Sequence, residues 1–166
     1  MFLVKWFSGT PWLFNLITFV TGCAFIVNLF FALKKWIRRK RYLQITKNMK
    51  DFCALSIGFG KNDPKEAVLE FIGKDKTDKL LSKRYTHKGD EEAFLTKQEV
   101  QNALNDIDCI IGSLRRNNCK EVLVFCAVPM AAALQIGYMF KNFHGKVKFM
   151  QPDSNKKYIV MAGPKE

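Results

Sequence analysis

The chain has 166 residues, of which 48% are hydrophobic, and it carries 27 Lys and Arg against 15 Asp and Glu, for a formal net charge of +12. This length excludes a large multidomain enzyme, and this hydrophobic content excludes an intrinsically disordered chain. The charge is unevenly placed, because residues 1–50 hold nine basic residues and no acidic residue. The basic character therefore belongs to one short segment near the N-terminus.

A long apolar stretch dominates this segment. From Trp12 to Leu33 the sequence runs for 22 residues without a charged side chain. At a rise of about 1.5 Å per residue, a helix of this length matches the roughly 30 Å hydrocarbon core of a bilayer. We therefore predict a transmembrane helix over residues 12–33, preceded by a short external N-terminus at residues 1–11. The alternatives are a secretory signal peptide, which usually has a shorter apolar core, and a buried core helix.

A basic run follows the apolar stretch directly. Residues 34–50 hold eight Lys and Arg, compared with Lys5 alone on the other flank. An excess of basic residues marks the cytoplasmic side, so we expect a single-pass protein with its N-terminus outside and residues 51–166 in the cytoplasm. We interpret residues 34–50 as a basic juxtamembrane linker that attracts anionic lipid headgroups. Nucleic-acid binding is the competing interpretation, and we expect no DNA partner.

Five small or uncharged polar residues fall on one side of the predicted transmembrane helix, within an arc of about 140° at 100° per residue. They are Asn15, Thr18, Thr21, Gly22 and Asn28. Polar groups in hydrocarbon seek partners and small residues allow close approach, so the arc indicates helix-to-helix contact or a pore lining, and hence a homo-oligomer. The alternative is that these side chains bond to their own backbone and that the helix is only an anchor.

The first half of the domain at residues 51–166 contains one clear strand. Residues 52–60 alternate, are rich in β-forming residues and break at glycine, which predicts a strand followed by a loop. Asp63 as N-cap and Pro64 at the first helical position predict a short helix up to Gly73, although its apolar residues also fit a strand. The polar stretch at residues 74–92 predicts a loop.

The second half contains the most regular pattern. Thr96 and Glu99 form a capping box, and apolar residues then recur at helical spacing up to residue 114. A central strand, a helix introduced by Pro129 and two short strands are predicted after it, at residues 121–127, 130–143, 146–150 and 158–162. This alternation predicts an α/β fold with right-handed crossovers, in which ligands sit beyond the carboxyl ends of the central strands.

Two loops are expected at that edge of the sheet. Their small residues let a ligand approach the backbone, free amides at a helix start attract anions, and Lys61 adds a positive charge. A phosphate-containing ligand is therefore expected, and the alternative is that Gly58 and Gly60 only form a tight turn. Without a GxGxxG or GxxxxGK[ST] motif, the sequence predicts neither a dinucleotide cofactor nor a nucleoside-triphosphate motor. The candidate ligand-binding residues are Gly58, Phe59, Gly60, Lys61, Asn62, Ala127, Val128, Pro129, Met130, Ala131 and Ala132.

Residues able to carry catalysis are scarce. His87 and His144 have no Cys, Asp or Glu at metal-ligand spacing, and both are expected to be solvated. The five cysteines form no CxxC motif and are expected to be reduced, with those in strands buried. The acid pairs Glu91/Glu92 and Asp106/Asp108 are expected on solvated faces. We predict no metal site, no cofactor and no enzymatic active site.

The C-terminal part of the chain resembles a known family. Residues Val122 to Gly163, VLVFCAVPMAAALQIGYMFKNFHGKVKFMQPDSNKKYIVMAG, are similar to the C-terminal part of a SAVED domain. That family shows a hydrophobic strand, a loop ending in proline, a helix with small residues and a glycine, then a strand and a hairpin with an aromatic residue. Here these places are filled by residues 122–127, Pro129, residues 131–133, Gly137, residues 147–150 and Tyr158, and FCALSIGFG at residue 52 is similar to the family's first strand.

The resemblance carries functional expectations. SAVED domains are related to CARF domains, Rossmann-like sensors that bind cyclic oligonucleotides, often cyclic oligoadenylates, made during phage infection. A transmembrane helix joined to such a sensor resembles the membrane-disrupting effectors of CBASS and type III CRISPR antiphage systems of bacteria. The resemblance thus implies antiviral defence at the inner membrane, with the ligand held by residues 58–62 and 127–132.

One departure from the family pattern affects assembly. SAVED modules usually fuse two CARF-like halves, whereas residues 51–166 have room for one half, so two or more chains would complete the ligand site. Two alternatives stay open at this point. The chain is a constitutive membrane-anchored scaffold whose α/β domain binds another protein, or it is an enzyme that cleaves its own cyclic ligand.

Overall fold

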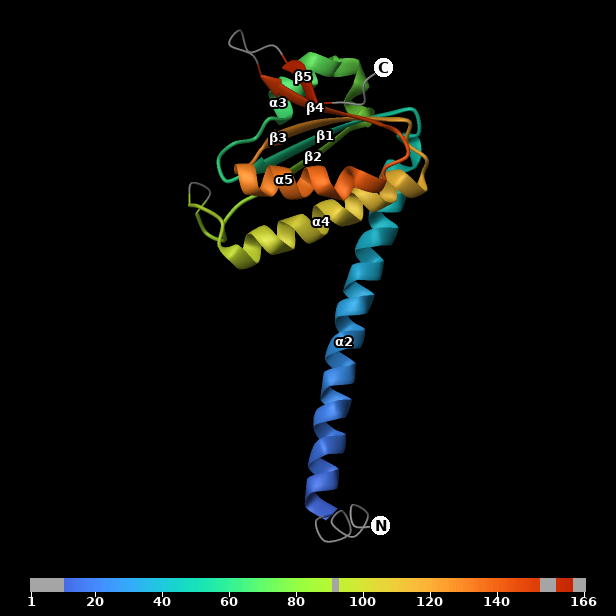
Figure 1. Cartoon of the computed structure of the whole chain (residues 1–166), viewed down its shortest axis with the longest axis vertical. Helices are drawn as coiled ribbons and strands as arrows, with labels where there is room; N and C mark the ends of the chain where they lie inside the picture. Colours follow the sequence, from blue (N-terminus) through green and yellow to red (C-terminus); the bar gives the residue numbers. More distant parts are fainter. Residues whose placement is uncertain (1–10, 91–92, 153–157, 163–166) are drawn as a thin grey trace. The chain divides into compact units, whose positions relative to one another are not determined.

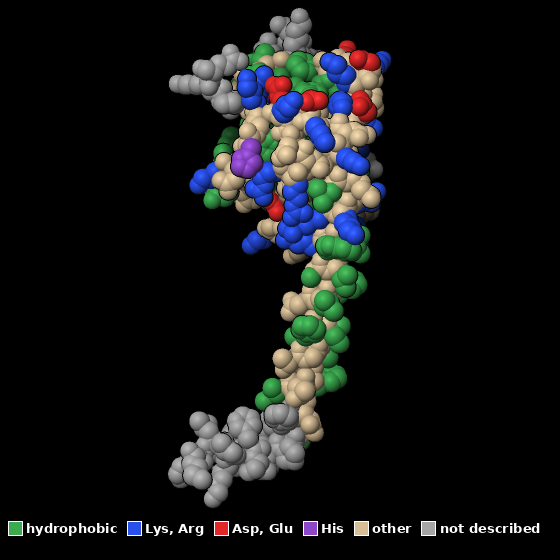
Figure 2. Space-filling view, turned by 90° about the vertical axis from the view of Figure 1, so that its right-hand side faces the viewer, with side chains coloured by type: hydrophobic (Ala, Val, Ile, Leu, Met, Phe, Trp, Pro, Cys, Tyr) green, Lys and Arg blue, Asp and Glu red, His purple; other side chains and the backbone are tan. Residues whose placement is uncertain are grey.

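The computed structural model describes residues 11–90, 93–152 and 158–162, and the chain divides into two compact units, residues 1–40 and residues 41–166. The described part of the first unit belongs to helix α2, Pro11–Ile45. This helix is long and apolar enough to span a membrane, and none of its apolar window is buried inside the chain. A core helix would bury this surface, whereas hydrophobic side chains line α2 openly in Figure 2.

The five residues of the predicted polar arc are exposed on α2, and Thr21 forms a hydrogen bond within the helix. The hydroxyl of Thr21 donates to the carbonyl oxygen of Ile17, four residues earlier. This bond is the one expected if the helix is an anchor, while Asn15 and Asn28 remain exposed on its surface. The helix continues without a break through the basic residues 34–41, where the Lys40 ammonium lies 4.1 Å from the centroid of the Trp36 ring.

The second unit is built on one mixed sheet of five strands in the order β2-β1-β3-β4-β5. The first four strands of this order are parallel, and β5 runs antiparallel to β4. The strands are β1 Phe52–Phe59, β2 Leu80–Tyr85, β3 Glu121–Ala127, β4 Lys146–Pro152 and β5 Tyr158–Ala162.

Helices cover both faces of this sheet (Figure 1), with α3 on one face and both α4 and α5 on the other. From β1 the chain moves to β2 on one side in the sheet, and from β2 it moves back past β1 to β3 on the other side. Because both connections are right-handed crossovers, α3 and α4 lie on opposite faces of the sheet. The helices are α3 Lys65–Ile72, α4 Lys97–Arg116 and α5 Met130–Met139, with short 3-10 turns η1 Thr46–Asn48, η2 Lys74–Lys79 and η3 Phe140–Asn142.

Burial on two sides explains the apolar sequence of β1. Alternate side chains, including Leu55 and Ile57, pack into the core beneath α4 and α5, while Ala54 packs into the smaller core beneath α3. Strand β3 is covered in the same way, with Val124 on the first side and Phe125 on the second. A near-continuous apolar run is therefore the pattern that both central strands require.

The structure confirms the α/β class and corrects the predicted elements in two places. Residues 74–92 were predicted to be a loop, and this is wrong, because they contain η2 and strand β2. As an edge strand, β2 buries only Leu81 and carries Ser82 and Lys83 in half-buried positions, so it lacks a strong apolar pattern. Helix α3 forms as predicted, but its N-cap is Pro64, and the carboxylate of Asp63 accepts a 3.0 Å bond from the amide of Lys65.

The second unit also begins earlier than residue 51. Its first ten residues include the last turn of α2, in which Tyr42 is buried, and the 3-10 turn η1, at which Thr46 and Met49 are buried. The side-chain amide of Asn117, at the C-cap of α4, donates to the carbonyl oxygen of Leu43 at 3.1 Å and to the hydroxyl of Thr46 at 2.7 Å. The C-terminal end of α2 is thus an integral part of the α/β unit.

We expect a fragment of residues 41–166 to be more stable than a fragment of residues 51–166, by at least about 3 kcal/mol, because the shorter one loses the buried side chains of Tyr42 and Met49. Urea unfolding followed by circular dichroism measures the difference. Equal unfolding midpoints and slopes for the two fragments would show that the end of α2 contributes nothing to the fold.

Candidate ligand-binding cavity

A cavity of about 680 Å³ opens where β1 and β3 end. The order of strands reverses between these two neighbours, so the loops that follow them leave toward opposite faces and a crevice forms between them. The lining residues come from three segments, namely Phe59, Gly60, Lys61 and Asn62; Ala93, Phe94, Leu95 and Val100; and Cys126, Ala127, Val128 and Pro129.

The loop after β1 forms the first wall, and it depends on a close backbone approach. A Cβ atom on Gly58 would lie 2.1 Å from the carbonyl oxygen of Asn62, so only glycine lets the chain turn back at this point. Gly60 has a φ of 67°, in the left-handed region that favours glycine. The loop thereby presents Lys61 and Asn62, both exposed, to the cavity.

The end of β2 holds this loop in place. The amide of Gly60 donates to the carbonyl oxygen of Tyr85 at 2.9 Å, and the guanidinium Nε of Arg84 donates to the carbonyl oxygen of Gly60 at 2.9 Å. The ring of Tyr85 also meets the ring of Phe59 edge to face, with centroids 5.7 Å apart. The amide and the carbonyl group of Gly60 are therefore both hydrogen-bonded to residues of β2.

The loop after β3 forms the second wall and leads into α5. Pro129 is the N-cap, and its carbonyl oxygen accepts the first intrahelical bond from Ala133 at 3.0 Å. The amides of the first turn have no earlier partner within the helix, so this end of α5 favours negative charge. Burial raises the pKa of the Cys126 thiol to about 12, so this part of the wall is uncharged at neutral pH.

The third wall was not anticipated from the sequence. Phe94 is 95% exposed, although it is a large apolar side chain on the lining of the cavity. Two neighbouring residues, Leu95 and Val100, also line the cavity. Leu95 directly precedes the N-cap Thr96 and Val100 follows it by four positions, which are the two positions of a hydrophobic staple. The hydrophobic staple beside the capping box was therefore the sequence signal that could have placed Leu95 and Val100 together.

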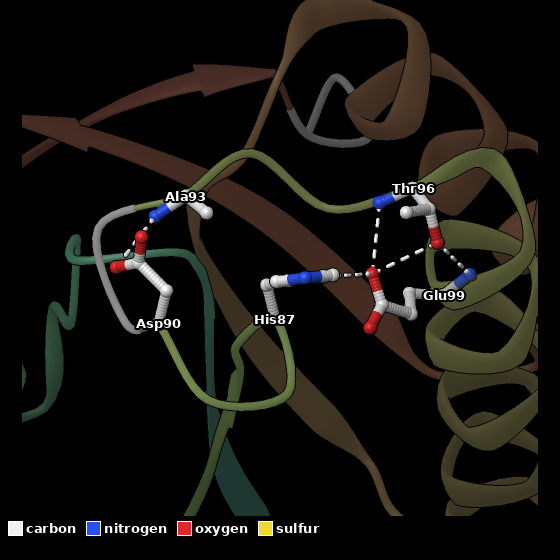
Figure 3. A network of polar contacts seen from close by, with 5 residues as sticks. All are labelled: His87, Asp90, Ala93, Thr96 and Glu99. Carbon is white, nitrogen blue, oxygen red and sulfur yellow. Dashed lines mark hydrogen bonds and ion pairs between the residues drawn. The ribbon is translucent and has the colours of Figure 1, made fainter.

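A network of polar contacts holds this third wall (Figure 3). The carboxylate of Glu99 accepts the amide and the hydroxyl of Thr96, both at 2.8 Å, while the hydroxyl of Thr96 accepts the amide of Glu99 at 3.3 Å. The ring Nδ1 of His87 lies 2.9 Å from the same carboxylate oxygen. On the other side of the segment, the carboxylate of Asp90 accepts the amide of Ala93 at 3.2 Å.

These donors have an electrostatic consequence for Glu99. The bond from His87 first, and then those from Thr96, lower the pKa of the Glu99 carboxyl to about 2. Because an ionised carboxylate can only accept, His87 donates through a protonated Nδ1. The capping box is confirmed, and the prediction that His87 is simply solvated is wrong, since it is half-buried and bonded to Glu99.

One acidic residue of α4 also differs from expectation. Asp106 was predicted on a solvated face, and this is wrong, because its Oδ2 accepts the hydroxyl of Tyr42 at 2.7 Å and that of Tyr85 at 3.0 Å. Its neighbour Asp108 is exposed, as is His144. The pair Glu91/Glu92 lies outside the described residues.

The structure brings seven of the eleven candidate ligand-binding residues together on the cavity, and these come from both predicted loops. The other four lie elsewhere. Gly58 is buried in β1 beneath the loop, Met130 and Ala131 are exposed on α5, and Ala132 is buried in the core. Within the described residues, no three or more His, Cys, Asp or Glu side chains gather where they could hold a metal ion.

The comparisons with known proteins add nothing to this geometry, since the sequence matches no family model and no curated protein.

We expect Gly58→Ala to destabilise the chain by about 1–3 kcal/mol, because its methyl group would overlap the backbone of Asn62. Gly112→Ala is the matched control, since a Cβ there meets nothing within 4 Å inside helix α4, and it should stabilise by about 0.5–1 kcal/mol. Thermal unfolding compares the two variants. A Gly58→Ala melting temperature equal to or above that of the parent would contradict the close approach.

The stability supplied by Glu99 should depend on pH. Its folded pKa of about 2 lies below the ordinary value of 4.5, so its contribution is complete above about pH 4.5 and fades as the pH falls toward 2. Glu99→Gln should therefore lower the melting temperature clearly at pH 7 and much less at pH 2.5. Glu70→Gln, at an exposed position of α3, serves as the control. A loss of the same size at both pH values would argue against the network.

Proposed function

We propose that the second unit binds a cyclic oligonucleotide in this cavity and that the chain is a membrane effector of bacterial antiphage defence. The observation that carries the proposal is the meeting of the loops after β1 and β3 around one cavity. These are the two loops in which the resemblance to the SAVED and CARF families implies the ligand. The strand order also reverses at this point, which is where ligands bind in open α/β sheets.

One side of the cavity has the chemistry for a phosphodiester. The exposed ammonium group of Lys61 supplies a positive charge, and the glycine backbone at Gly60 allows a close approach. The start of α5 lies behind Pro129 with free amides, which favour an anion. Together they form a lining that stabilises negative charge.

The other side has the chemistry for a planar base. An almost fully exposed phenyl ring is costly in water, and Phe94 stands beside the apolar side chains of Leu95 and Val100. Aromatic side chains on nucleotide-binding surfaces stack on bases, with about 1–3 kcal/mol per base. A ligand that combines a base with a phosphate fits both sides at once.

The proposed output is a change in the membrane. In this proposal α2 crosses the inner membrane with its N-terminus outside, and homo-oligomers of the chain complete the ligand site and disrupt the bilayer. Binding shifts the resting arrangement toward the active one only if the ligand prefers the active one, by about 1.4 kcal/mol for each tenfold change in population.

Titration of the full chain in lipid nanodiscs with cyclic di-, tri- and tetra-adenylate should show binding of at least one ring. Lys61→Ala and Phe94→Ala should each weaken that binding by about tenfold, through the lost charge and the lost stacking. Lys141→Ala, an exposed lysine that does not line the cavity, should leave the dissociation constant unchanged. Silence across this panel and across rings of mixed bases would overturn the proposal.

One observation favours a second candidate, a constitutive scaffold that binds another protein. Helix α5 leaves Met130, Leu134 and Tyr138 between 70% and 81% exposed, and their spacing places them on one face. Such a face suits a protein partner and needs no nucleotide. The two candidates differ in vesicle leakage, which depends on the cyclic oligonucleotide for the effector and is independent of it for the scaffold.

A further inference from the structure

A single carboxylate oxygen joins the end of α2 to the strand that holds the cavity. Oδ2 of Asp106, on α4, accepts one hydrogen bond from Tyr42 at 2.7 Å and another from Tyr85 at 3.0 Å. Tyr42 belongs to the last turn of α2, and Tyr85 is the last residue of β2. The three side chains come from three different elements of the same compact unit.

From Tyr85 the contacts continue to the cavity. Its ring packs on Phe59 with an interplanar angle of 82°, and its carbonyl oxygen accepts the amide of Gly60 at 2.9 Å. Both Phe59 and Gly60 line the cavity. A ligand that shifts the loop after β1 therefore acts on Tyr85 through its ring and through its backbone.

On the other side, Tyr42 is held firmly within the unit. Its side chain is 5% exposed, and the ammonium group of Lys83 lies 5.0 Å from its ring centroid. Its carbonyl oxygen accepts the hydroxyl of Thr46 at 2.8 Å, so the residue is tied to the turn that follows. Packed and directional contacts of this kind transmit displacement, because they tolerate few alternative arrangements.

We propose that Asp106 couples the occupancy of the cavity to the C-terminal end of α2, with Tyr85 as the cavity-side and Tyr42 as the helix-side contact. The identity of the ligand rests on the proposed function, whereas the coupling rests on these contacts. Asp106 is a positioning residue, since it does not line the cavity.

A purely structural anchor would not need this arrangement. The same end of α2 is already fixed by Asn117, which donates to Leu43 and Thr46, and the ammonium group of Lys79 donates to the carbonyl oxygen of Asn48 at 2.6 Å. Neither anchor includes a residue of the cavity lining. The bond from Tyr42 to Asp106 differs from both anchors. Its acceptor, the Oδ2 atom of Asp106, also accepts a bond from Tyr85, which contacts the lining residue Phe59.

The test uses amide hydrogen exchange of residues 41–49 in the full chain in nanodiscs, which reports local opening of this segment. Phe59→Leu removes the ring contact with Tyr85 without any ligand. We expect it to raise exchange by about threefold in the parent chain and to have little further effect in a Tyr42→Phe background, where the link is already cut. Tyr42→Phe keeps the ring, and a melting curve confirms that it is folded.

Asn117→Ala is the matched control background. It loosens the same end of α2 by removing a different anchor, so the threefold effect of Phe59→Leu should persist in it. An effect of Phe59→Leu that is equally large in the Tyr42→Phe background would overturn the coupling, and so would the absence of any effect in the parent chain.

A second arm uses cyclic tri-adenylate and cyclic tetra-adenylate as probes. A probe that binds should change exchange at residues 41–49 in the parent and in Asn117→Ala but not in Tyr42→Phe. Binding with the same change in Tyr42→Phe overturns the coupling and leaves the proposed function standing. If neither probe binds, neither of these two rings is the ligand, and the comparison with Phe59→Leu alone supports or overturns the coupling.

Discussion

The reversal of strand order between β1 and β3 is the constraint on which the candidate site depends. The chain leaves β1 toward α3 on one face and leaves β3 toward α5 on the other, so the two loops diverge at the same edge. Gly58 then allows the backbone at Asn62 to turn back closely over the sheet, and the start of α4 closes the third side. The result is a cavity lined by Lys61 in the loop after β1 and by Phe94, Leu95 and Val100 around the start of α4.

The central elements of this fold were predictable because burial on two faces leaves a strong sequence pattern. The apolar runs of β1 and β3, the capping box at Thr96 and both loops at the cavity could be read from local sequence. The edge strand β2 could not, because a half-solvated strand carries polar residues. Phe94 was missed because its importance arises from the cavity beside it and not from any period in the sequence.

Long-range contacts explain the remaining differences. Asp106 has the local sequence of a solvated helix face. Only its partners, 64 and 21 residues away, show that it lies half-buried between two tyrosines. In the same way, residues 34–50 have the local sequence of a linker, but Tyr42, in the last turn of α2, is buried in the core of the α/β unit. The apolar stretch and Tyr42 thus belong to one helix, α2, whose final turn is part of the α/β unit.

The central claim is that the cavity binds a cyclic oligonucleotide through the loops after β1 and β3. Nuclear magnetic resonance of the ¹⁵N-labelled full chain in detergent micelles tests this binding most directly. Backbone amide shifts are followed while cyclic di-, tri- and tetra-adenylate are added in turn. If the ligand binds at these loops, the amides of Gly60, Lys61 and Val128 shift most and saturate together. Shifts that concentrate on the exposed face of α5, or spectra that do not change at all, would contradict it.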